Sequence, residues 1–200
     1  MNTYQQAEIS FRQNGGVLKT TQALALGIHP RTLYSLRAHG RLIQVNRGLY
    51  RLADQKLTEH HGLAMISKLV PRGIICLLSA LRFHRLTTQA PFEVWLALGR
   101  AMRKPKINHQ PIRIVRFSGA ALGMGVDKHV IEGVTVHVYN PAKTVADCFK
   151  YRHKIGLDVA LEALREGWRE RRFTMDELWC YGKICRVANV MQPYLEALAV

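Results

Sequence analysis

The stretch that decides the fold is residues 15–52, GGVLKTTQALALGIHPRTLYSLRAHGRLIQVNRGLYRL. Thr20 or Thr21 can cap a helix over residues 22–26, because a hydroxyl accepts a hydrogen bond from the first helical N–H groups. Gly27 can end that helix in the left-handed conformation that glycine adopts at low cost. The stretch therefore begins with one short, sharply bounded helix.

A second helix and a hairpin follow. Pro30 suits the first position of a helix, and Gly40 would end that helix. Residues 42–45 and 49–52 are apolar enough for two short strands, and the turn 46–48 carries a glycine where a hairpin needs one. Two helices across a tight turn, followed by a hairpin, predict a winged helix-turn-helix, an arrangement typical of DNA-binding domains.

Helical spacing divides the second helix into two faces. Leu33 and Leu36 share the face that would pack on the first helix, and polar residues lie opposite or beside it. The outward N-terminal residues of such a helix reach base edges, while arginines of the wing suit phosphates. The predicted DNA-binding residues are Thr20, Thr21, Arg31, Thr32, Tyr34, Ser35, Arg37, Arg41, Arg47 and Arg51. The alternative is a small helical subdomain with an ordinary solvated basic face.

The charge of the chain points to a polyanionic partner. The net charge is +15. Residues 1–56 hold eight basic and two acidic residues, residues 57–150 hold thirteen and five, and residues 151–200 hold eight and seven. Because the excess lies in the first three quarters of the chain, the sequence predicts a nucleic-acid-binding surface there.

Composition also bounds the location and the chemistry. No apolar run reaches the roughly 18 residues that a membrane helix needs, and the polar start MNTYQQ is unlike a signal peptide. The four cysteines show no spacing of a disulfide framework, which suits reduced thiols in the cytoplasm. We expect no metal, no cofactor and no membrane partner.

The remainder of the chain predicts an α+β fold with two domains, 1–56 and 57–200. The first would begin with a helix over residues 3–13. In the second, helices over 57–69 and 75–86 precede a small antiparallel sheet built from 92–98, 111–117 and a hairpin of 129–131 with 134–139. Several helices then close the chain: 140–152 capped by Asn140, 156–172, one capped by Thr174, and 187–199.

A second basic segment lies between Glu93 and Asp127, a stretch without any acidic residue. A loop between two strands could lie along a nucleic-acid backbone there, since each phosphate contact releases counterions. The alternative is a solvated loop that only keeps the protein soluble. The residues concerned are Arg100, Arg103, Lys104, Lys106, Arg113 and Arg116.

Catalytic patterns are weak, and the sequence predicts no enzyme. Ser79 and His84 are five positions apart on a predicted helix, so they face different directions, and no G-x-S-x-G surrounds the serine. Cys180 and Cys185 have the same separation, with no histidine pair to complete a zinc site.

The segment GVLKTTQALALGIHPRTLYSLRAHGRLIQVNRGLYRL resembles the winged-helix domain of AbiEi-type antitoxins of type IV toxin–antitoxin systems. The likeness continues through CLLSALRFHRLT (76–87), FEVWLAL (92–98) and NPAKTVADCFKYR (140–152). It implies a recognition helix over residues 30–39 and a wing over 42–52. It also implies a repressor that binds inverted repeats in its own promoter, and a C-terminal domain that counters a nucleotidyltransferase-like toxin, usually without a stable complex.

Two other functions stay open at this point. The winged fold could be the scaffold of a module that binds RNA or a protein, or the chain could be an orphan transcriptional regulator without a toxin. A toxin gene beside this one would favour the antitoxin, whereas sequence-independent RNA binding would favour the module.

Overall fold

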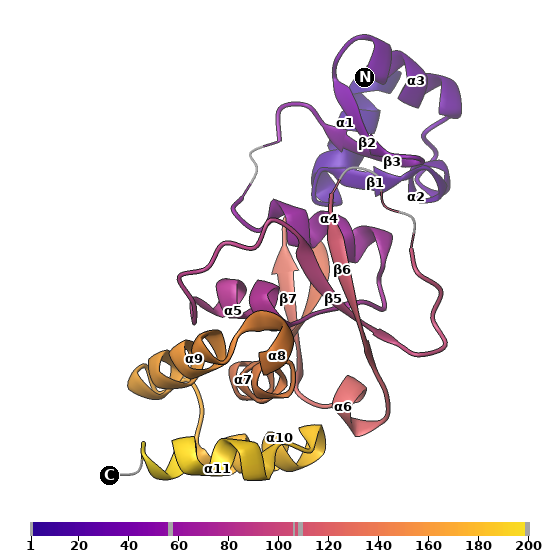
Figure 1. Cartoon of the computed structure of the whole chain (residues 1–200). Helices are drawn as coiled ribbons and strands as arrows, with labels where there is room; N and C mark the ends of the chain where they lie inside the picture. Colours follow the sequence, from indigo (N-terminus) through magenta and orange to yellow (C-terminus); the bar gives the residue numbers. More distant parts are fainter. Residues whose placement is uncertain (1, 56–57, 106, 108–109, 199–200) are drawn as a thin grey trace.

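A computed structural model describes residues 2–55, 58–105, 107 and 110–198 of the chain. It places a small bundle of helices and strands at one end and a larger sheet covered by helices at the other (Figure 1). The predicted domain boundary at 56/57 lies outside the described residues.

The N-terminal part is a winged helix-turn-helix, as the sequence predicts. A three-stranded sheet in the order β1-β3-β2 closes it, and both strand pairs are antiparallel. Phe11, Leu18, Leu33 and Leu36 are buried together in its core. The elements are α1 (Thr3–Gln13), β1 (Val17–Lys19), α2 (Thr20–Ala25), α3 (Pro30–Ala38), β2 (Leu42–Asn46) and β3 (Leu49–Leu52).

The C-terminal part is built on a five-stranded sheet in the order β6-β5-β4-β8-β7. Its strands are β4 (Ile74–Ile75), β5 (Val94–Gly99), β6 (Ile112–Phe117), β7 (Val126–Ile131) and β8 (Val134–Tyr139). Its helices are α4 (His61–Leu69), α5 (Leu77–His84), α6 (Ala120–Gly123), α7 (Pro141–Lys150), α8 (Arg152–Ile155), α9 (Leu157–Arg169), α10 (Met175–Cys185) and α11 (Ala188–Glu196). The α+β class is therefore confirmed.

The sheet differs from the prediction in one respect, because it is mixed and not purely antiparallel. β5 pairs with β6 in parallel, and so does β4 with β8. The loop after β5 is long enough to return the chain to the other end of the sheet before β6 begins, and alternation alone does not encode strand direction. The predicted helix 75–86 is wrong at its start, because Ile75 belongs to the two-residue strand β4, Cys76 is extended and α5 begins only at Leu77.

Helices cover both faces of this sheet, as the elements in Figure 1 show. Leu96 and Val136 pack with Ile66 of α4 on the face nearer the winged helix. Trp95 and Ala97 lie in the other core, with the helices from α7 onward. Both faces of β5 are consequently buried, which explains why its sequence is apolar almost throughout.

The two parts of the chain pack against each other. Val17 and Leu49 of the winged helix share an apolar cluster with Met65 of α4. The Glu132 carboxylate, whose side chain is 4% exposed, accepts a hydrogen bond from Thr58 N–H at 2.9 Å and lies 2.7 Å from His61 Nδ1. A methyl group on Gly15 would overlap the Glu132 carbonyl oxygen. The tip of the hairpin between β7 and β8, where Glu132 lies, therefore fixes how the winged helix sits on the sheet.

The core between β8 and α10 encloses an ion pair. Lys143 Nζ lies 2.5 Å from Asp147 Oδ2, and both side chains are 0% exposed. The ammonium sits 4.1 Å from the centre of the Tyr139 ring, and Cys185 Sγ donates to Asp147 Oδ1 at 3.2 Å. Burial raises the pKa of Asp147, while the adjacent Lys143 ammonium acts in the opposite direction. A charge in this place depends on its partner, since water does not reach it.

Candidate nucleic-acid interface

The turn between the two helices of the motif is set by Gly27 and Pro30. Gly27 has φ +79°, and Ile28 N–H donates to the Ala23 carbonyl at 2.9 Å, which ends α2 as predicted. The predicted cap of this helix is wrong, because α2 starts at Thr20 and its N-cap is Lys19. Gln22 explains the earlier start of the helix, because its side-chain oxygen accepts the Lys19 N–H at 3.1 Å. The helix can therefore begin at Thr20 without a hydroxyl cap.

The recognition helix α3 presents the outward face that the sequence predicts. Leu33 and Leu36 are buried, while Arg31, Tyr34 and Arg37 are exposed, Tyr34 by 60%. Thr32 is only 8% exposed. It lies one turn before Leu36 and so shares the buried face, which makes it a packing residue of this helix.

Several predicted contact residues are held by neighbours within the winged helix. Arg41 donates from Nε and Nη2 to the two oxygens of Glu8, each at 2.8 Å. Arg37 donates to Gln44 Oε1 at 2.7 Å, which links α3 to the wing. The Ser35 hydroxyl lies 3.0 Å from that of Tyr4. These bonds orient the side chains, and they neutralise part of the charge of Arg41.

The wing carries its basic residues at different depths. Gly48 has φ +69° in the turn, as predicted, and the exposed Arg47 precedes it. Arg51 is half-buried and donates to the Leu52 carbonyl at 3.2 Å. Near the turn, the half-buried Thr20 donates its N–H to the Gly48 carbonyl at 2.8 Å, whereas Thr21 is exposed. Arg47 and Thr21 are therefore the freer groups on this side.

The second basic segment divides into free and structural residues. Arg100, Arg103 and Lys104 are exposed in the loop after β5, whereas Lys106 lies outside the described residues. Arg113 lies 2.5 Å from Glu93 and stacks on Trp95, 4.8 Å from the ring centre. Arg116 donates to the carbonyls of Gly99 and Met102, at 2.7 and 2.6 Å, and so shapes the loop.

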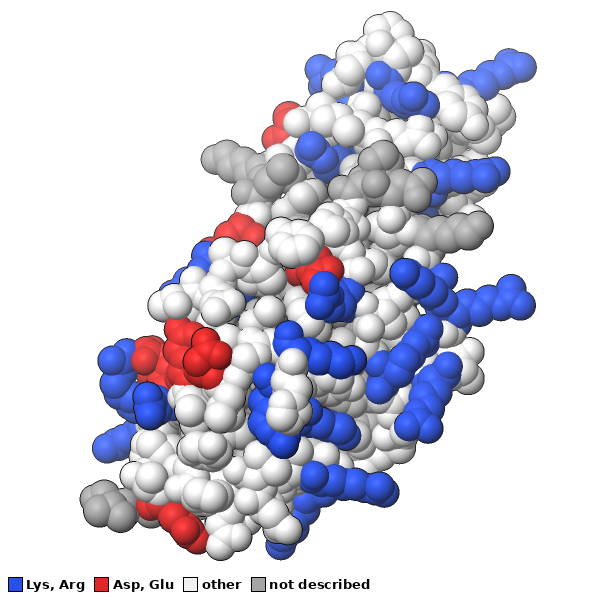
Figure 2. All heavy atoms as spheres, viewed as in Figure 1, with Lys and Arg blue, Asp and Glu red and all other residues white. Residues whose placement is uncertain are grey.

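Lys and Arg side chains gather along one side of the molecule in Figure 2, from the winged helix down past the level of the larger sheet, while Asp and Glu lie mostly toward the other side. On the face that Figure 2 shows, the basic and acidic residues are thus unevenly distributed. Such a side suits a long polyanion better than a small ligand.

Residues 5–53 match the family described as transcriptional regulator, AbiEi antitoxin. In this part the chain is similar to the AbiEi antitoxin family. The match covers the three helices and three strands of the winged helix from α1 to β3 almost completely. The sequence-based resemblance is confirmed for these residues, whose matching family is one of antitoxin transcriptional regulators.

The fold of the chain recurs in a solved structure. The RV2827C protein from Mycobacterium tuberculosis superposes with a TM-score of 0.58 and 13% sequence identity. The match covers 99% of this chain and 81% of that one, so both parts share its fold. No curated protein matches the sequence significantly.

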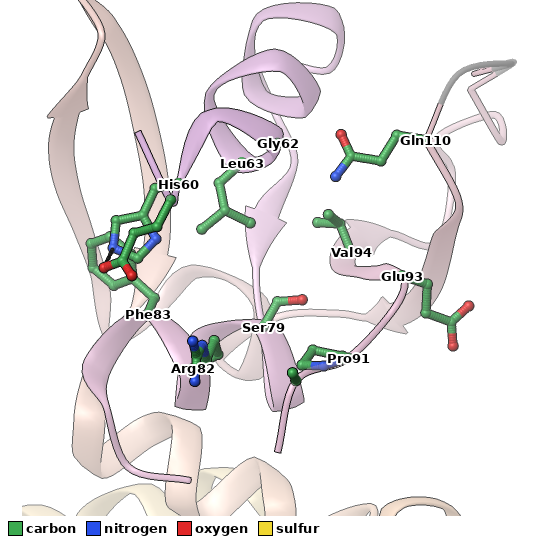
Figure 3. Close-up of a pocket in the computed structure, with 12 residues that line it drawn as sticks. His60, Gly62, Leu63, Ser79, Arg82, Phe83, Pro91, Glu93, Val94 and Gln110 are labelled. Carbon is green, nitrogen blue, oxygen red and sulfur yellow. Dashed lines mark ion pairs between the residues drawn. The ribbon is translucent and has the colours of Figure 1, made fainter. Parts of the chain in front are cut away.

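A cavity of about 210 Å³ lies between the start of α4 and α5. Figure 3 shows His60 and Leu63 from the start of α4, Ser79 and Arg82 from α5, and Gln110 from the loop before β6 around it. This cavity is smaller than the usual ligand pocket, which measures about 300–1,000 Å³. The Ser79 hydroxyl accepts the Trp95 N–H at 2.9 Å, so it belongs to the packing of α5 on β5.

The weak catalytic patterns of the sequence do not come together in the structure. His84 Nε2 lies 2.7 Å from the Tyr139 carbonyl, whereas the Ser79 hydroxyl accepts a hydrogen bond from the Trp95 N–H. Cys185 is buried beside Asp147, whereas Cys180 is exposed. In the described ranges, no group of three or more His, Cys, Asp and Glu residues is arranged to hold a metal. No described helix is long and apolar enough to span a membrane.

Sequence reasoning missed the role of one residue at the start of the recognition helix, His29. It is the N-cap of α3, and its Nδ1 accepts the Arg31 N–H at 3.2 Å. The signal was present, because the residue before a proline at the first helical position is the N-cap. Histidine is not among the preferred capping residues, so composition alone places it in the turn.

Proposed function

We propose that this chain is a DNA-binding transcriptional autorepressor and the antitoxin of a type IV toxin–antitoxin system, acting in the cytoplasm against a nucleotidyltransferase-like toxin. The observation that carries the DNA-binding part is the exposed polar face of α3, held on a winged helix of the AbiEi family. Double-stranded DNA of its own promoter, arranged as inverted repeats, is the proposed partner.

In this proposal α3 enters the major groove and the wing lies along the backbone. Arg31 is exposed at the second position of α3, and its guanidinium can bind guanine with two hydrogen bonds. Tyr34 and Ser35 lie one turn further along the same helix. Arg47 and Thr21 meet phosphates beside the groove, where they add affinity without reading sequence.

The second basic segment extends the same surface toward the larger sheet. Arg100, Arg103 and Lys104 are exposed and would lie along phosphates. Arg116 supports them, since its hydrogen bonds to two loop carbonyls hold the loop in shape. Substituting Arg103 should weaken binding to all DNA sequences alike, as a backbone contact does.

A mobility-shift assay with the chain's own promoter tests the DNA-binding part. Arg31→Ala should lose about 1–3 kcal/mol on the promoter and less on scrambled DNA. Arg12→Ala is the matched control, because Arg12 is an exposed arginine of the same domain that pairs with Asp54. If wild-type protein binds promoter, scrambled DNA and RNA alike, the RNA-binding module is the better reading.

Growth rescue tests the antitoxin part. The resemblance assigns protection from the toxin to the part after the winged helix, so the full-length Arg31→Ala/Arg47→Ala variant should still rescue cells that express a nucleotidyltransferase-like toxin from the neighbouring gene. Loss of rescue together with loss of DNA binding would contradict this division of roles. Absence of any toxin gene beside it would identify an orphan regulator.

A further inference from the structure

His29 stands where the recognition helix begins, and it is exposed. Its backbone is extended, with φ −67° and ψ 146°, and its ring folds back over the first turn of α3. Nδ1 accepts the Arg31 N–H at 3.2 Å, while its carbonyl accepts the Thr32 N–H at 2.9 Å. One residue thus accepts the first two N–H groups of the helix.

This capping changes what the end of the helix offers to DNA. The first turn of a helix normally exposes N–H groups that can bind a phosphate directly. Here Pro30 has no N–H, and those of Arg31 and Thr32 already have partners. Contact with DNA at this end must therefore come from side chains.

The same hydrogen bond fixes where the imidazole carries its proton. A ring nitrogen that accepts an N–H has its lone pair free of a proton, so in the neutral ring the proton sits on the other nitrogen. Nε2 is consequently an N–H donor, on the side of the ring away from the helix. Among the residues that the structure describes, none forms a hydrogen bond with it.

We propose that His29 is a DNA-contacting residue that donates its Nε2–H to an acceptor on DNA beside the site of Arg31. The acceptor is a base-edge atom in the major groove, such as guanine N7 or O6, or a phosphate oxygen next to it. The inference rests on the proposed DNA-binding function, and it adds a donor whose direction the cap itself sets.

The test separates the cap from the donor in the full-length protein. Wild-type protein first selects its preferred sequence from a library of randomised duplexes, and affinities for this duplex and a scrambled one are then measured by fluorescence anisotropy. His29→Ser keeps an N-cap oxygen but lacks the donor, whereas His29→Ala lacks both. His39→Ser is the matched control, because His39 is exposed at the opposite end of α3 and its Nδ1 lies 2.8 Å from the Ser35 carbonyl.

His29→Ser should weaken binding to the selected duplex about three- to tenfold, the value of one hydrogen bond, with an unchanged melting temperature. Loss confined to the selected duplex, with a relaxed preference at one base pair, assigns the contact to a base edge; equal loss on both duplexes assigns it to a phosphate. Unchanged affinity, or an equal loss in His39→Ser, overturns the inference. If wild-type protein selects no sequence at all, it is the proposed function that fails.

Discussion

The buried pair Lys143–Asp147 gives a sharp test of the energetics of this fold. Replacing Lys143 by methionine keeps most of the length of the side chain but removes the ammonium that pairs with Asp147, which is 0% exposed. The carboxylate would then be buried beside the Cys185 thiol and aromatic rings, without a counter-charge. It must either stay charged in an apolar place or take up a proton, and both are unfavourable at neutral pH.

The expected loss is about 3–5 kcal/mol, the effect of removing one partner of a buried pair. In a chain of this size 1 kcal/mol shifts the melting temperature by about 2–4 °C, so the melting temperature of Lys143→Met should fall by about 6–20 °C. The double variant Lys143→Met/Asp147→Val should recover most of the loss, because it leaves no charge in the core and the two desolvation penalties vanish together.

Urea unfolding followed by circular dichroism measures these differences. Arg12→Met is the control, since the pair Arg12–Asp54 has the same 2.5 Å separation but side chains 56% and 58% exposed, and its loss should stay below about 1 kcal/mol. Equal destabilisation of the single and double variants would refute the reasoning, because the pair would then stabilise the fold by more than its own desolvation.

Three further predictions concern the wing and the contact between the two parts. Arg47→Ala should weaken binding to all DNA sequences and lower the slope of log affinity against log salt by about one unit, whereas an unchanged slope would show that the wing tip points away from DNA. Gly15→Ala should destabilise the protein by more than Gly27→Ala in thermal melts. Both glycines have positive φ, but a methyl group at Gly15 also meets the Glu132 carbonyl, whereas nothing lies within 4 Å at Gly27. Equal losses would show that the tip of the β7–β8 hairpin moves to make room. Burial acts to raise the pKa of Glu132, but hydrogen bonds from Thr58 and His61 outweigh it and hold the pKa below its usual value. This carboxylate therefore stabilises the fold at pH values above its unfolded-state pKa. Its contribution is lost as the pH falls through the folded-state pKa. Unfolding free energies from about pH 6 to about pH 3 should therefore fall less steeply for Glu132→Gln than for wild type, and parallel curves would contradict it.

Local chemistry explains why the winged helix could be predicted from the sequence. Gly27 and Gly48 permit positive φ where the chain turns, and Pro30 fixes φ where the helix begins, so the turn, the helix start and the hairpin follow from single residues. Leu33 and Leu36 then orient α3 through helical spacing alone. The exposed face with Arg31 and Tyr34 could be predicted from the sequence for the same reason.

Contacts between distant residues decided the rest. The pairing of Arg41 with Glu8 joins residues 33 positions apart, and the support of the loop by Arg116 depends on a parallel pairing of β5 with β6. Neither contact can be predicted from the spacing of residues along the sequence. Charge counts could therefore find the basic segments but could not tell a free arginine from one with a structural partner.

Lys143 and Asp147 show the same limit most clearly. Their spacing of four residues is visible in the sequence and would ordinarily indicate a pair on the solvent side of a helix. Only the tertiary structure places them inside, because β8, α10 and the ring of Tyr139 close over this face of α7. The sequence determined which residues could pair along the helix; the packing of elements far apart in the chain determined that the pair is removed from water, and burial is a property of all the neighbours together.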